Sequence, residues 1–148
     1  MTDLLDEIVE AHGGLARWNE LETVSAHLVQ GGAVWGLKGR QGVLDDVRIE
    51  QWRRLRVVWP AHLATHNGVQ TVYVDDDGLI RREDYDVDIM AGSPGAHYIA
   101  GFTQVAGITL PTERRILPRT PEGQALAEPL LVSIDLSDLS DLSDLTFA

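Results

Sequence analysis

Apolar residues at the start of the chain recur at the spacing of a helix and would form one stripe: Leu4, Leu5, Ile8 and Val9. Asp3 can cap this helix, because its side chain can accept a hydrogen bond from a free backbone N–H of the first turn. Gly13 and Gly14 would end it. The next segment, LARWNELE, predicts one or two further helical turns.

From Thr23 onward the pattern is that of strands and turns. Runs rich in Val, Ile, Thr and aromatic residues are separated by Gly, Pro, Asn and Asp. Because no helix of convincing length separates these runs, we expect a largely antiparallel meander of about eight to nine strands. The predicted strands lie near residues 23–30, 33–38, 43–50, 53–59, 69–75, 79–88, 96–105, 108–117 and 129–136.

The acidic segment VYVDDDGLIRREDYDVD, residues 72–88, has two interpretations. Asp77-Gly78 between two strand-like runs predicts a hairpin, since glycine accepts the positive φ of a tight turn. A calcium loop is the alternative, but Tyr73 would occupy its first ligand position. The hairpin is favoured, and the alternating acids that follow it are expected on a solvated face rather than as a paired general acid and base: Asp84, Asp86 and Asp88.

The end of the chain repeats Ser-Asp-Leu three times, a period that fits neither a strand nor a helix. We expect Ile134 and Leu136 to finish the last strand. The sequence therefore predicts a single domain over residues 1–136. Residues 137–148 would be a frayed or irregular tail rather than a binding motif.

Composition narrows the function classes. The chain has 148 residues, of which 44% are hydrophobic, so one domain with a sizeable core is expected. A net charge of −11 disfavours nucleic acid and anionic membranes as partners. The absence of cysteine excludes disulfides and thiol chemistry. No apolar run of about 18 residues could span a membrane. Acids occupy the N-terminal region where a signal peptide needs lysine or arginine, which predicts the cytoplasm.

Three histidines are the strongest candidates for catalysis. His62 and His66 are four residues apart, and His97 could supply a third nitrogen to a zinc ion. The glutamate of an H-E-x-x-H motif is missing, so satisfied or exposed histidines are favoured over a metal site. Phosphate loops, dinucleotide fingerprints and nucleophile elbows are also missing, and no cofactor is expected.

Four segments in order carry a resemblance to a known family: EAHGGLARWNELETV, SAHLVQGG, TVYVDDDGLIRREDYDVD and HYIAGFTQVAGITLPTERRI. Their order resembles the LolA-like superfamily of lipoprotein carriers and related lipid-binding proteins. The resemblance implies an α+β fold, a curved antiparallel half-barrel with the N-terminal helix packed on its apolar concave face. The acids near the N-terminus predict that this chain lacks the signal peptide of the exported carriers. It is also shorter around GVLDDVRIEQWRRLRVVWP, which would leave a sheet edge unpaired and allow a homodimer.

The leading functional hypothesis is non-enzymatic binding of an apolar small molecule, lipid or acyl chain in the concave face. Aromatic side chains on strands offer large apolar contact, although ordinary core packing is the alternative for each. The candidate ligand-binding residues are Ile8, Trp35, Trp59, Tyr73, Tyr85 and Tyr98. One alternative is a metal-assisted hydrolase that uses His62, His66 or His97 with Asp84. The other is a protein-interaction domain acting through a sheet edge or the leucine-containing tail.

Overall fold

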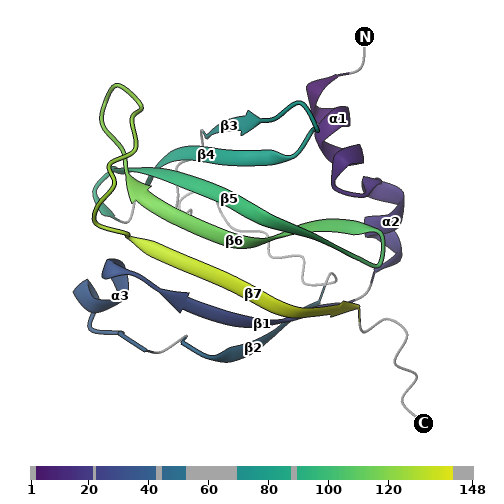
Figure 1. Ribbon diagram of the computed structural model, residues 1–148, viewed down its shortest axis with the longest axis horizontal. Coiled ribbons are helices and arrows are strands. Elements are labelled where there is room, and N and C mark those ends of the chain that lie inside the picture. Colours follow the sequence, from purple (N-terminus) through teal and green to yellow (C-terminus); the bar gives the residue numbers. More distant parts are fainter. Residues whose placement is uncertain (1–2, 22, 43–44, 53–69, 88–89, 142–148) are drawn as a thin grey trace.

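The computed structural model describes residues 3–21, 23–42, 45–52, 70–87 and 90–141. Within them the chain forms one seven-stranded antiparallel sheet, accompanied by three short helices (Figure 1). The sheet is curved and does not close, so the predicted α+β class with a curved antiparallel sheet is confirmed. No helix in this part of the chain is both long and apolar enough to cross a lipid bilayer.

The two N-terminal helices are α1, Leu4–Ala11, and α2, Gly14–Glu20, as the sequence predicts. Asp3 caps α1, where its side chain accepts a hydrogen bond of 3.4 Å from the backbone N–H of Leu5. Between the helices Gly13 has a φ of +107°, a conformation that side chains rarely adopt.

The third helix, α3, spans Ala33–Leu37. The sequence predicted a strand at 33–38, and this prediction is wrong. At Gly32, with φ +113°, the chain leaves the preceding strand, and the next two backbone N–H groups donate to Leu130 O and Leu131 O. A Cβ at Gly32 would lie 2.4 Å from Leu131 O. This tertiary contact at the start of the segment turns the chain, so the local β-propensity does not decide its structure.

The strands are β1 Thr23–Gly31, β2 Val47–Trp52, β3 Thr71–Val74, β4 Ile80–Val87, β5 Ser93–Val105, β6 Ile108–Pro118 and β7 Val132–Asp141. Their order in the sheet is β2-β1-β7-β6-β5-β4-β3. The number is lower than predicted because 33–38 is helical, while the expected strand at 53–59 lies outside the described residues. The sheet is also not a simple meander, since β7 pairs between β1 and β6. β2 and β3 are the two edge strands of the described sheet. A homodimer formed through one of these edges stays a prediction.

The acidic hairpin forms as predicted. Gly78 has a φ of +77°, and its N–H donates to Asp75 O at 2.9 Å, while Asp75 N donates to Leu79 O at 3.1 Å. The turn carboxylates are used locally, because Asp77 Oδ1 accepts from Leu79 N at 3.0 Å and Arg81 forms ion pairs with both Asp75 and Asp77. The acids at 75 and 77 therefore stabilise the turn and its flanks.

The Ser-Asp-Leu repeat enters the sheet. β7 continues to Asp141, so the predicted end of the last strand near Leu136 is too early. Ser137 pairs with His27 and Ser140 with Ser25, so three residues of β7 span two residues of β1. Asp138, with φ +50°, is the extra residue of this β-bulge. The extra residue shifts the register once, so the three-residue Ser-Asp-Leu repeat can continue in a strand whose side chains alternate every two residues. Residues 142–148 lie outside the described part of the chain.

α1 and α2 lie at one end of the sheet, against two hairpin turns (Figure 1). A Cβ on Gly78, in the β3–β4 turn, would lie 2.8 Å from Ala11 Cβ. At the β5–β6 turn, Thr109 N donates to His12 O at 3.1 Å, and Arg17 donates to Ala106 O. The absence of a side chain at Gly78 thus allows α1 to approach the turn closely.

We predict that Gly78→Ala destabilises the protein more than Gly92→Ala does. Gly92 has a similar φ of +74°, and no atom of the described residues lies within 4 Å of an added Cβ, so Gly92→Ala reports the backbone strain alone. That strain should cost about 1 kcal/mol at both positions. Gly78→Ala should lose roughly a further 1–3 kcal/mol, because the methyl group overlaps α1. Urea unfolding measures both losses, and equal losses would show that α1 does not dock on this turn.

Candidate functional site

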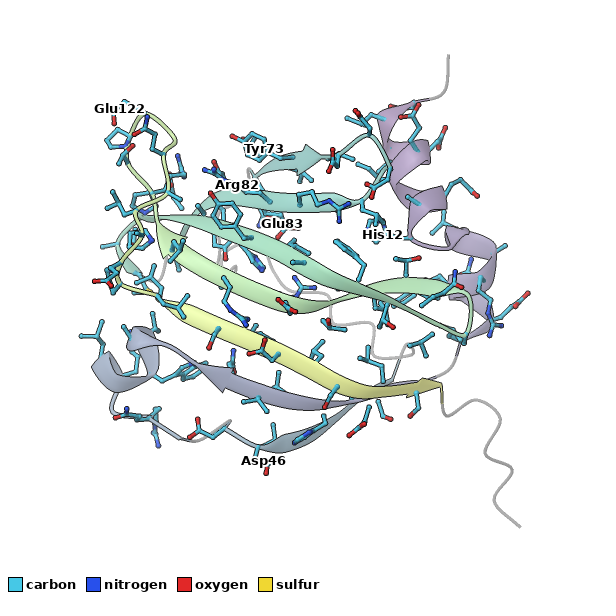
Figure 2. All side chains as sticks on the ribbon, in the orientation of Figure 1. His12, Asp46, Tyr73, Arg82, Glu83 and Glu122 are labelled. Atoms are coloured by element: carbon cyan, nitrogen blue, oxygen red, sulfur yellow. The ribbon has the colours of Figure 1, made fainter. Side chains whose placement is uncertain are left out.

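One concave region is polar and lies beside β3 and β4, under the loop that follows β6. It has a volume of about 340 Å³, and its lining includes Tyr73, Asp84, Asp86, Arg119, Pro121 and Glu122. Tyr73 pairs with Arg82 across β3 and β4, and Asp84 and Asp86 follow Arg82 at alternate positions. Since alternate residues of a strand share a face, these side chains lie on one side of the sheet. Figure 2 shows Tyr73 and Arg82 side by side on β3 and β4. We call this region the polar cleft.

Asp84 is the most buried acid of the polar cleft, with only 6% of its surface exposed. Arg82 donates a hydrogen bond to each carboxylate oxygen of Asp84, from Nε at 2.6 Å and from Nη2 at 2.9 Å. The Tyr73 hydroxyl donates to the same carboxylate at 3.2 Å. The predicted solvated acidic face is therefore wrong at Asp84. A bidentate arginine supplies the hydrogen bonds that allow a carboxylate to be buried.

Arg82 ties the loop after β6 to the sheet. Its Nη2 also donates to Gly123 O at 2.7 Å. The hydrogen bond to Asp84 raises the pKa of Arg82 against the opposing effect of burial, so the guanidinium keeps its charge. Its Cζ lies 5.2 Å from the ring centroids of both Tyr73 and Tyr98, and Nη1 donates to Tyr98 Oη at 3.2 Å. Two of the predicted ligand-binding residues thus flank one cation.

Arg119 fixes the second carboxylate of the polar cleft. It donates from Nη2 to Asp86 Oδ1 at 2.9 Å and from Nε to the Gly95 carbonyl at 3.3 Å. The side chain of Asp86 is 45% exposed, whereas that of Arg119 is only 17% exposed. Asp86 is therefore the carboxylate that solvent or a small molecule can reach, and Arg119 holds it in place.

Tyr85 and His97 lie on the opposite face of the sheet from Asp84. In the β4–β5 register Glu83 pairs with His97 and Asp84 with Ala96, which separates the odd from the even positions. The rings of Tyr85 and His97 meet edge to face at 6.0 Å, and both residues are buried. His97 Nδ1 lies 3.4 Å from Glu83 Oε2, and its buried Nε2 has no partner among the described residues.

The positions of Asp84 and His97 on opposite faces bear on the alternative hypothesis of a metal-assisted hydrolase. Asp84 and His97 cannot act on one substrate, because the sheet lies between them. His62 and His66 lie outside the described residues. Within the described ranges no group of three or more His, Cys, Asp or Glu side chains could hold a metal ion.

A second concave region is apolar and lies between the two N-terminal helices and the start of β6. It has a volume of about 330 Å³, and its apolar lining residues are Val9, Leu15, Trp18, Ile108, Leu110 and Pro111. Leu15 is 61% exposed and Trp18 is 42% exposed, while Ile108 is buried. His12 also lines this region; its Nδ1 donates to Ile8 O at 2.9 Å, and its ring packs edge-on against Phe102. We call it the apolar groove.

The six residues predicted to line one cavity are distributed over the fold. Tyr73 and Tyr98 flank Arg82. Tyr85 is buried with its ring against His97 on the other face of the sheet, and it also contributes to the lining of the polar cleft. Ile8 is half-buried on α1. Trp35 lies in α3 with its Nε1 buried and without a partner among the described residues. Trp59 lies outside those residues.

Sequence reasoning missed the two most exposed residues of the apolar groove, Leu15 and Trp18. They are three apart in α2, so they lie on the same side of that helix. This spacing was the available signal, because two large apolar residues on one side of a short helix need a partner surface. The segment LARWNELE was interpreted only as a helix.

Comparison with known proteins gives no match: no family model, no curated protein and no solved structure is similar to this chain. The LolA-like resemblance accordingly stays a prediction. The two concave regions are the observations from which function can be argued.

We predict that Tyr85 makes stability fall at alkaline pH. Burial, with Glu83 adding to it, raises the pKa of Tyr85 to about 12. An unfolded tyrosine has a pKa of about 10. Between these values the unfolded chain loses the proton and the folded chain keeps it, so the contribution is intact below pH ~10 and declines toward pH ~12. From pH 9 to 11 the free energy of unfolding should fall about 1.3 kcal/mol more in the wild type than in Tyr85→Phe.

Urea unfolding of both proteins at the two pH values provides the measurement. The comparison is of pH dependence, so any change in stability that the substitution causes equally at both pH values cancels. The other tyrosines are present in both proteins and cancel. Identical pH dependence in wild type and variant would contradict the prediction.

Proposed function

We propose that this chain is a non-enzymatic binding protein that holds an apolar small molecule, lipid or acyl chain in the apolar groove. The observation that carries the proposal is an apolar concavity in which Trp18 and Leu15 are substantially exposed. Large apolar side chains left open around a concave surface are typical of ligand sites. The volume of about 330 Å³ falls within the range of roughly 300–1,000 Å³ of small-molecule pockets.

Both the floor and the rim of the groove are held in place by the fold. Ile108, at 3% exposure, forms part of the floor and is anchored in β6. The rim comes from α2, which is fastened to the β5–β6 turn through the hydrogen bond from Arg17 to Ala106 O. Arg17 also pairs with Glu20 at 2.8 Å, so its charge is neutralised. These contacts favour an uncharged, apolar occupant over an anion.

Burial of apolar surface supplies the affinity. Each methylene removed from water contributes about 0.8 kcal/mol, so a short acyl segment in the groove would bind detectably.

We predict that Leu15→Asp weakens binding of the neutral dye phenylnaphthylamine at least about tenfold, a loss of about 1.4 kcal/mol. The dye should bind the wild type saturably and be displaced by uncharged long-chain alcohols. Leu5→Asp is the matched control, because Leu5 has a similar exposure of 64% but does not line the groove. Its affinity should stay within about twofold of wild type, since no groove contact is lost.

Thermal unfolding checks that both variants are folded. Little change is expected, because each replaced leucine is already more than half exposed. Failure of the wild type to bind dye saturably would end the proposal. Equal weakening by Leu15→Asp and Leu5→Asp would place the dye elsewhere on the helices and would also contradict it.

A further inference from the structure

We propose that the polar cleft is a second binding site and that it takes a neutral, hydroxyl-rich molecule, a saccharide or polyol. The cleft is separate from the apolar groove, because one lies at the β4 end that leads to Val87 and the other beside α1 and α2. Figure 2 shows the two regions at opposite ends of the sheet, with Glu122 at the cleft and His12 at the groove.

Charge balance favours a neutral ligand. Two guanidinium groups, of Arg119 in the lining and of Arg82 beside it, are paired with the carboxylates of Asp86 and Asp84. The remaining charge of the lining is the Glu122 carboxylate at the exposed rim, which repels an anion. A cation would lie beside the two guanidinium groups. A neutral hydroxyl group avoids both penalties, because it can donate to a carboxylate and accept from a guanidinium or tyrosine.

The polar cleft also offers open hydrogen-bonding positions. Asp86 accepts from Arg119 on Oδ1, and within the described residues its Oδ2 has no hydrogen bond. Glu122 adds an exposed carboxylate at the rim, and Tyr73, also in the lining, has a hydroxyl that donates to Asp84 and can still accept a hydrogen bond. Acceptors and donors are thus interspersed over a small area. Such interspersion matches a ligand with several hydroxyl groups better than a single ion.

The polar groups of the cleft are rigidly held. Arg82 is held by Asp84 and by Gly123 O, and Arg119 by Asp86 and by Gly95 O. The side chains of both arginines are largely covered, with 18% and 17% exposed. Binding groups that are already fixed lose little conformational entropy when a ligand arrives. The hydrogen-bond pattern of the cleft is therefore set before binding.

The cleft also has an apolar wall. Tyr73 is 46% exposed and lines the cleft, with Pro121 also in the lining. A tyrosine ring offers an apolar face together with a polar hydroxyl. A sugar ring has the same dual character, with C–H groups on its faces and hydroxyls around its edge. The C–H face would stack on Tyr73 while the hydroxyls reach Asp86 and Arg119.

Ligand-observed NMR with methyl glucoside, methyl galactoside, methyl mannoside and inositol tests the proposal. At least one probe should bind the wild type saturably, with a dissociation constant of about millimolar order. Tyr73→Ala should weaken that binding at least about fivefold by removing the wall. Tyr98→Ala is the matched control: its ring also lies 5.2 Å from Arg82 but does not line the cleft, so affinity should stay within about twofold.

Asp86→Asn provides a second variant. It removes the negative charge of a side chain that is already 45% exposed, and it should lower the affinity for the same probe. Leu15→Asp, in the apolar groove, should leave the affinity for this probe unchanged. Three results would overturn the proposal: no saturable binding of any probe, equal loss in Tyr73→Ala and Tyr98→Ala, or tighter binding of inorganic phosphate or spermidine than of the sugars. The last result would show that the cleft selects charge instead of hydroxyl groups.

Discussion

The pairing of β7 with both β1 and β6 is the constraint on which the rest of the structure depends. It joins the β1–β2 hairpin to the β3–β6 strands, because the last described strand inserts beside the first. The bulge at Asp138 adjusts the pairing of β7 with β1. Beyond it the Ser140 hydroxyl lies 2.8 Å from the hydroxyl of the fully buried Ser25 and hydrogen bonds to it. Pairing of segments this far apart in sequence carries a high loop-closure cost, so β7 is expected to dock late in folding.

The two concave regions arise from different features around this sheet. The apolar groove exists because two helices rest on hairpin turns instead of being buried, which leaves Leu15 and Trp18 open. The polar cleft exists because the loop after β6 turns back to β4, where Arg82 bonds to Gly123 O. One region therefore favours apolar surface and the other favours hydrogen-bonding groups.

Asp84 shows how a charge is accommodated under the loop. Burial of a carboxylate costs several kcal/mol unless partners replace the lost water, and here a bidentate arginine and a tyrosine hydroxyl do so. The same arginine holds the loop, so burial of the charge and formation of the cleft are one event. On the opposite face Tyr85 and His97 are buried beside Glu83, and burial there favours the neutral tyrosine.

The sequence by itself determined the elements that local patterns control. Helical spacing located α1 and α2, alternation located most strands, and Asp77-Gly78 located a hairpin, because each depends on residues within a few positions of one another. The tertiary structure decided what depends on distant segments. Contacts with Leu130 and Leu131 made 33–37 a helix, pairing with β1 drew the Ser-Asp-Leu repeat into a strand, and Arg82 with the loop at Gly123 buried Asp84. For the candidate sites, aromatic content pointed to Tyr73, but periodicity gives only the face of a strand. Which side chains share a cavity follows from strand order and from the loops that cover each face, and those are set by long-range pairing.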